Sequence, residues 1–128
     1  MTPGELNQRT GQVINAAMKV HTTLGPGLLE SAYQACLTYE LRKRGFAVRE
    51  EVSIPLFYEE MRLDLAYRAD LIVDDAVIVE VKAVEQLIPK HEAQLQTHLK
   101  LGHFRVGLLI NFHEEHLRDG IRRRVNSL

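Results

Sequence analysis

The sequence predicts an α/β fold in which a mixed β-sheet is flanked by helices. Two segments near the N-terminus carry apolar residues at steps of three and four, which is helical spacing. The centre of the chain then changes to the β-branched pattern of strands. Further on, a helical segment separates two strongly apolar runs, and such a crossover makes the two strands parallel neighbours.

Residues 5–23 form the first expected helix, in which Leu6, Val13, Ala17 and Val20 recur on one face. Gly25-Pro26-Gly27 ends it, because proline cannot continue a helix. A second helix is expected over residues 28–44. It has Glu30 in its first turn and basic residues in its last turn, as the helix dipole favours.

Three extended segments are expected next, the last two as separate strands or as one long bent strand: 47–54, 56–63 and 67–74. Pro55 indicates an edge strand or a break, since proline cannot donate to a strand ladder. Asp74-Asp75 predicts a tight turn. Residues 76–84 follow as a β-branched run that is typical of a buried central strand.

The C-terminal third begins with an expected helix over residues 89–101, with proline near its start. A buried strand is expected over residues 105–112. The remaining stretch is amphipathic and basic, and its pattern does not decide between helix and strand. The expected sheet therefore has four strands or slightly more, within one domain covering residues 1–128.

Composition excludes several classes of protein. Hydrophobic residues make up 45% and charged residues 26% of the 128, which is the globular range. The net charge of -1 excludes binding to nucleic acid by bulk positive charge alone. The single cysteine excludes an internal disulfide. No apolar run reaches the ~20 residues of a membrane helix, and the start lacks a signal-peptide layout, so a cytoplasmic protein without membrane contact is expected.

Charged residues in the expected central strand are the feature that needs an explanation. Glu80 and Lys82 point to the same face of this strand, because side chains two apart share a face. Burying either charge is costly unless a partner compensates it. Asp70, on the preceding strand, would come close to Glu80 if the two strands pair antiparallel. A divalent cation between the two carboxylates would remove their repulsion.

This arrangement predicts a magnesium or manganese site. Mg²⁺ takes one or two carboxylates together with carbonyl oxygens and waters, and the Val81 carbonyl is a candidate ligand. Lys82 could position a water or neutralise a phosphate oxygen, so phosphodiester hydrolysis is the chemistry indicated. The alternative is a solvated strand face on which Glu80 and Lys82 form a structural ion pair.

Two helices could add to this site. Glu30 on the second helix is either a further acid near the metal or only a complement to the helix dipole. On the third helix, His91, Gln94 and His98 share one face. Gln94 could bond a water or a phosphate, whereas the other interpretation is a polar, solvated helix face.

Five segments, in order and without large gaps, resemble the GxxExxY family, which is grouped with the PD-(D/E)XK nuclease-like superfamily. They are Gly27–Tyr33, Tyr67–Asp70, Ile78–Ala83, His91–Thr97 and Gly107–Phe112. The resemblance implies a restriction-endonuclease-like core. It also implies that Asp70, Glu80 and Lys82 form the D…ExK signature, with both acids as metal ligands.

The same resemblance assigns further roles. Glu30 would be the extra acid of the first core helix, and Gln94 the glutamine that tyrosine usually follows four residues later. Here His98 occupies that place, and histidine can also donate to phosphate. Ala69 stands where the superfamily motif has proline.

Two functions follow as alternatives: a Mg²⁺-dependent nuclease acting on DNA, or a non-catalytic module that keeps the fold and binds nucleic acid or protein. For nucleic-acid contact, the candidates are Tyr33, His98 and the basic triad Arg122-Arg123-Arg124, although a solvated tail also explains the triad. A chain this short covers little of a duplex alone, so a homodimer is expected.

Overall fold

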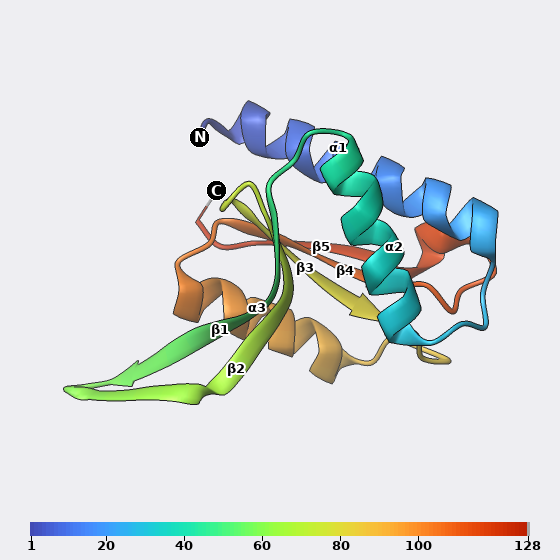
Figure 1. The fold of residues 1–128 in the computed structure, drawn as a ribbon. Coiled ribbons are helices and arrows are strands. Elements are labelled where there is room, and N and C mark those ends of the chain that lie inside the picture. The colour runs from blue at the N-terminus through green and yellow to red at the C-terminus, as the bar shows by residue number, and fades with distance from the viewer. Residues whose placement is uncertain (128) are drawn as a thin grey trace.

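A mixed sheet lies between α1 and α2 on one face and α3 on the other (Figure 1). In chain order the elements are α1 (Pro3–Leu24), α2 (Glu30–Lys43), β1 (Val48–Tyr58), β2 (Met61–Val73), β3 (Val77–Lys82), α3 (Pro89–Gly102), β4 (Val106–Asn111), the 3₁₀ helix η1 (Leu117–Gly120) and β5 (Ile121–Val125). This computed structural model describes residues 1–127, apart from the side chains of 65 and 66; Leu128 lies outside the described residues.

The sheet has five strands in the order β1-β2-β3-β4-β5. The α3 crossover joins β3 to β4 as parallel neighbours, as expected, and all other neighbours are antiparallel. The fifth strand comes from the C-terminal stretch whose structure the sequence left open. The expected α/β architecture, a mixed sheet with helices on both faces, is confirmed.

The face under α1 and α2 holds the larger core. Thr2 and Glu5 cap the start of α1 reciprocally, which satisfies backbone N–H groups that a helix end leaves free. Apolar side chains of α1 and α2 pack on the odd-numbered residues of β3, such as Val79 and Val81. Burial of these branched side chains is the main force that fixes both helices on the sheet.

The opposite face is covered by α3 alone. Leu95 and Leu99 of α3 pack on Ile78 and on neighbouring side chains of the sheet. The helix comes so close that a Cβ at Gly107 of β4 would lie 2.8 Å from the Leu95 side chain and 3.2 Å from the Ile78 carbonyl oxygen. Glycine at this position therefore sets the depth at which α3 rests on the sheet.

The β1–β2 hairpin corrects one sequence expectation. Residues 56–63 do not form one strand, because the turn at Glu59-Glu60 divides them between the end of β1 and the start of β2. Glu59 has a φ of 53°, which glycine or asparagine would normally supply, so the sequence carried no turn signal there. Pro55 lies within β1, as an edge strand allows, and the pairing register shifts between Ile54 and Leu56.

Candidate active site

The β2–β3 ladder ends just before Asp70 and Glu80. The paired residues run from Val73↔Val77 to Leu71↔Val79, so Asp70 and Glu80 occupy the next position of the same register. There each carboxylate accepts a backbone N–H from the opposite strand. Asp70 Oδ2 accepts from Val81 N–H at 2.8 Å, and Glu80 Oε2 accepts from Asp70 N–H at 3.4 Å. The two carboxyl groups are therefore held side by side where the strands separate.

Alternation along β3 places Glu80 and Lys82 on the face covered by α3. Ile78, two residues before Glu80, packs under Leu95 and Leu99, whereas Val79 and Val81 belong to the core under α1 and α2. Glu80 is buried and Lys82 is half-buried. The expected shared face is confirmed, although β3 ends at Lys82 and does not extend to residue 84.

A polar hollow of about 290 Å³ opens at this point between β2, β3 and α3. Six of its lining residues are ones that the sequence identified as candidates or as part of one polar helix face, and two are not: Asp70, Glu80, Lys82, His91, Gln94 and His98, together with Tyr67 and Arg68. The structure thus brings together the two acids, the lysine and the polar face of α3.

Burial raises the pKa of Asp70 from 3.8 to about 7. Desolvation is the largest cause, and the negative charge of Glu80 is the second; the Val81 N–H acts in the opposite direction. The closeness of the Glu80 carboxyl group favours the protonated form of Asp70 as well. Ionising both carboxyl groups of such a partly buried pair is unfavourable, because two negative charges then lie side by side with little water around them.

His98 supports the second acid of the pair. Its Nδ1 atom lies 2.5 Å from Glu80 Oε1, and both side chains are buried. An ionised Glu80 can only accept this bond, which places the hydrogen on Nδ1. Within the described part of the chain no ion pair joins Glu80 to Lys82, so the structural ion pair considered as an alternative is not formed.

The donor set suits a small divalent cation with few protein ligands. Among residues 1–127, side chains 65 and 66 aside, no three His, Cys, Asp or Glu side chains form a ready cluster. Asp70 and Glu80 nevertheless provide two hard carboxylate groups in an open polar hollow, and Mg²⁺ in proteins keeps several waters beside one or two carboxylates. The two acids therefore fit such an ion, with the remaining positions left to water or substrate.

Glu30 lies near this hollow without lining it. The side chain is exposed in the first turn of α2, on the other face of the sheet from α3. Its charge is nevertheless the last of the causes that raise the pKa of Asp70. Glu30 is thus close enough to act through its charge, while the structure gives it no contact with Asp70 or Glu80.

Tyr33 is a structural residue, which corrects its place among the nucleic-acid contacts. The side chain is fully buried and its ring stacks on Phe112 at 4.7 Å. Its hydroxyl group donates to Gly25 O at 2.5 Å and accepts from Leu28 N–H at 3.0 Å. Tyr33 therefore fastens the turn between α1 and α2, where Gly27 has a φ of 102°.

The basic triad forms part of β5 and is not a solvated tail. Arg122 and Arg124 both pair with Glu92 of α3, at 3.2 and 2.9 Å, and Arg123 donates to Asn7 of α1 at 2.5 Å. These contacts attach both helix layers to the edge strand. None of the three arginines lines the hollow at Asp70.

Sequence reasoning missed two kinds of site residue. Tyr67 and Arg68 line the hollow, and their position three and two residues before Asp70 on one strand was the available signal. Asn111 is fully buried, accepts from Val84 N–H at 3.0 Å and donates to Val84 O at 2.8 Å. It fixes the chain where it leaves β3, and a single Asn at a strand end gave no sequence signal.

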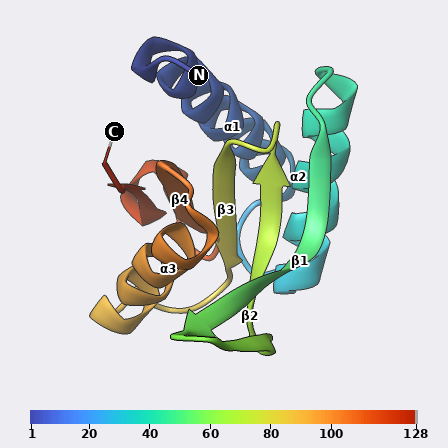
Figure 2. The same ribbon diagram turned by 90° about the vertical axis from the view of Figure 1, so that its left-hand side faces the viewer.

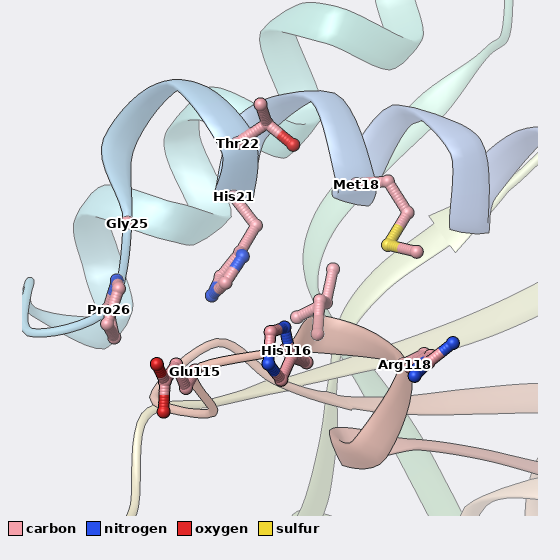
Figure 3. A pocket seen from close by; sticks show the side chains of 9 residues that line it. Met18, His21, Thr22, Gly25, Pro26, Glu115, His116 and Arg118 are labelled. Atoms are coloured by element: carbon pink, nitrogen blue, oxygen red, sulfur yellow. The ribbon is translucent and has the colours of Figure 1, made fainter.

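A larger hollow lies elsewhere, between the end of α1 and the segment after β4 (Figure 3). His21 points into it from α1, and its Nε2 atom lies 2.7 Å from Glu114 O. His116 and Arg118 approach from the opposite side. Glu115 is the only carboxylate among its lining residues, so this hollow lacks the paired acids of the Asp70 site.

Comparison with known proteins gives one match. The family model described as the PD-(D/E)XK nuclease superfamily matches residues 7–124, which include every residue of the hollow at Asp70. The search of curated proteins finds no significant match, and the search of solved structures finds none. The fold agrees with the family's restriction-endonuclease-like core. No helix in the described part of the chain is long and apolar enough to span a bilayer.

Proposed function

Because the chain belongs to the PD-(D/E)XK nuclease superfamily, we propose that it is a metal-dependent nuclease that hydrolyses DNA phosphodiester bonds at the Asp70–Glu80 pair. Superfamily membership supports a nuclease with a divalent metal and a nucleic-acid substrate. Mg²⁺ or Mn²⁺ as the ion, and DNA as the substrate, are the specific parts of the proposal.

One observation carries the proposal: two carboxyl groups share a partly buried hollow in which the pKa of Asp70 rises to about 7. A carboxyl pair of this kind is poorly stable by itself at neutral pH, and a cation would stabilise its ionised form. Metal binding releases the proton that the pair retains. At neutral pH the ionised carboxyl pair is therefore more stable with a divalent cation bound than without one.

Each residue of the hollow has a separate role in this proposal. Asp70 and Glu80 hold the cation, His98 orients Glu80, and the Val81 carbonyl stays a candidate ligand. Lys82 donates hydrogen bonds to a phosphate oxygen or to the attacking water, while Gln94 positions the phosphate from α3. The bound cation would stabilise negative charge on the phosphate and make a hydroxide available near neutral pH.

A cleavage assay tests this assignment. Plasmid and single-stranded DNA are incubated with Mg²⁺ or Mn²⁺ and with Asp70→Asn, Glu80→Gln or Lys82→Met. Each variant should lose about 100-fold or more of the activity, since it removes charge or a donor at the reacting group. Glu85→Gln and Lys90→Met replace exposed residues nearby and should cleave as the original chain does. Equal residual cleavage in all five variants would contradict the proposal.

The second candidate is a non-catalytic module that binds nucleic acid or protein. It is favoured by the lack of a cluster of three His, Cys, Asp or Glu side chains at the hollow among the described residues. Calorimetric titration with Mn²⁺ separates the two functions. A nuclease predicts binding that Asp70→Asn abolishes, and a module without catalysis predicts no heat of metal binding.

Two narrower assignments also remain proposals. Gly27, Glu30 and Tyr33 support membership of the GxxExxY family within the superfamily, because the glycine and the tyrosine together shape the turn before α2. A homodimer is proposed from the small size of the chain, and light scattering of the purified protein measures it.

A further inference from the structure

The outer half of the β1–β2 hairpin projects beyond the helices that cover the rest of the sheet (Figures 1 and 2). On the face that α3 covers further in, Ile54 is buried in the core under that helix. Alternation along β1, together with its cross-strand partners on β2, puts four exposed apolar side chains on the same face beyond it. We call these residues the apolar stripe: Tyr67, Leu63, Met61 and Tyr58.

Exposure increases steadily along the apolar stripe. Tyr67 is 37% exposed, Leu63 42%, Met61 51% and Tyr58 66%. Scattered exposed apolar residues are normal on a protein surface, but a continuous row of them marks a binding surface. Cross-strand pairing supports the continuity, because Ile54, Leu56 and Tyr58 follow one another on β1 at steps of two. They face Tyr67, Leu63 and Met61 of β2 in turn, although the register shifts after Ile54.

The apolar stripe begins at the candidate active site. Tyr67 lines the hollow that contains Asp70 and Glu80. Its ring meets the His98 ring edge-on at a centroid distance of 5.8 Å, and His98 is bonded to Glu80. A ligand lying on the stripe would therefore reach directly into the hollow with its inner end.

The charges around the hairpin do not suit the backbone of a duplex. Residues 48–73 include six acidic and three basic residues. Arg62 pairs with Asp64 at 2.6 Å, and Arg68 lies 3.6 Å from Glu51. These arginines are partly neutralised, so the hairpin offers few free cations to a row of phosphates. A duplex can present only phosphates and base edges to such a surface. An unpaired strand can turn its base faces toward the apolar stripe and its phosphates toward water.

Strand addition at the free edge of β1 is also disfavoured. Pro55 lacks a backbone N–H, and Glu51 has a φ of 52° that interrupts a regular edge. The face of the hairpin, and not its edge, is therefore the surface available to a ligand.

We propose that the apolar stripe is the binding surface for the unpaired bases of single-stranded nucleic acid, and that it directs the strand into the hollow at Asp70. The proposal rests on the nuclease function proposed above and names its substrate class. Tyr58 and Tyr67 stack on bases, Met61 and Leu63 fill the space between them, and the inner phosphate lies within reach of Lys82 and Gln94. Stacking is tolerant of sequence, because every base has an aromatic face.

Fluorescence anisotropy in EDTA tests this without any cleavage. The probes are a labelled oligothymidine and a labelled duplex of equal length. The single strand should bind more tightly, and Tyr58→Ser or Tyr67→Ala should each weaken its binding about fivefold or more. Phe57→Ser is the matched control. Phe57 is exposed next to Tyr58 but points to the other face, where Arg62 covers its ring at 5.4 Å, so its loss should change nothing.

Several results would overturn the proposal. They are tighter binding of the duplex, an equal effect of Phe57→Ser, or a dimer that Tyr58→Ser dissociates while oligothymidine binding stays unchanged. The last result would make the stripe an interface between two copies of the chain. Selective single-strand binding without cleavage in Mg²⁺ or Mn²⁺ would instead refute the nuclease proposal and leave the binding surface in place.

Discussion

Replacing Asp70 with asparagine should stabilise the metal-free protein at pH 8 and remove its stabilisation by a divalent cation. Asparagine can keep the bond from the Val81 N–H, and its amide N–H is a donor that the neighbouring Glu80 carboxylate can accept. It cannot ionise. The substitution therefore removes the repulsion between two neighbouring carboxylates while keeping their hydrogen bonds.

The magnitude follows from the pKa of Asp70, which rises from 3.8 to about 7 on folding. The folded protein therefore binds a proton more tightly than the unfolded chain. Its free energy of unfolding falls as the pH rises from about 4 to 7 and stays reduced above that range. A shift of this size corresponds to about 4 kcal/mol at most. Because Asp70 is only half-buried, screening by water reduces the expected gain to about 1–2 kcal/mol.

Thermal unfolding in EDTA at pH 5.5 and pH 8 measures the effect. Asp70→Asn should raise the Tm at pH 8 by roughly 3–8 °C and at pH 5.5 by about half as much, because pH 5.5 lies midway between the unfolded pKa of 3.8 and the folded pKa of about 7. With Mn²⁺ at about 100 times its Kd, the original chain should gain about 2.7 kcal/mol and the variant nothing. Asp119→Asn, at an exposed carboxylate, should respond to neither change.

The outcome that refutes the reasoning is a Tm difference between Asp70→Asn and the original chain that is equal at both pH values. This would mean that Asp70 has an ordinary pKa and that the two carboxyl groups do not interact. An unchanged response of the variant to Mn²⁺ would show that any cation binds elsewhere.

Three other substitutions test separate parts of the structure. Tyr33→Phe removes both bonds of the hydroxyl group, leaves the Leu28 N–H without this partner, and should cost about 1–3 kcal/mol in urea unfolding; full stability would contradict a structural role. Gly107→Ala should cost about 1–3 kcal/mol by overpacking under α3, and a neutral result would mean that the helix can move away. His98→Ala should weaken Mn²⁺ binding about 10- to 100-fold in calorimetry by freeing Glu80, and unchanged affinity would exclude this support.

The fold was predictable where local pattern and tertiary structure agree. The central strand, the α3 crossover and the parallel neighbour all followed from β-branched runs separated by a helical segment. The hairpin was missed because its turn is made by Glu59-Glu60, which carry no turn preference, and because Pro55 sits inside β1. The C-terminal stretch that forms β5 was left open between helix and strand, because it is held by contacts of its arginines to two helices, and those contacts are not local.

The candidate site was predictable from burial and charge, but the roles of its aromatic residues were not. Two acids and a lysine in apolar strands indicated a shared hollow, since isolated buried charges are costly. Tyr33 and Tyr67 look alike in the sequence, and only packing separates them. The first is enclosed by Phe112 and the α1–α2 turn, while the second stands at the edge of the hollow. Exposure, which sequence pattern alone does not fix, decides which of them can touch a ligand.

The hollow and the projecting hairpin have one structural origin. Pairing of β2 with β3 stops at Leu71↔Val79, and beyond it the carboxylates of Asp70 and Glu80 replace the ladder bonds across the gap. A β2 strand that stayed paired with β3 would close the hollow and keep the hairpin in the sheet. Separation of the two strands at Asp70 therefore opens the hollow beside the acids and directs the outer hairpin past α3, so a ligand on Tyr67 lies beside the carboxyl pair. If the bond from the Val81 N–H to Asp70 fixes the point of separation, Asp70→Leu, which cannot accept it, should weaken both metal binding in the hollow and oligothymidine binding. Asp70→Asn keeps this bond and should weaken only metal binding.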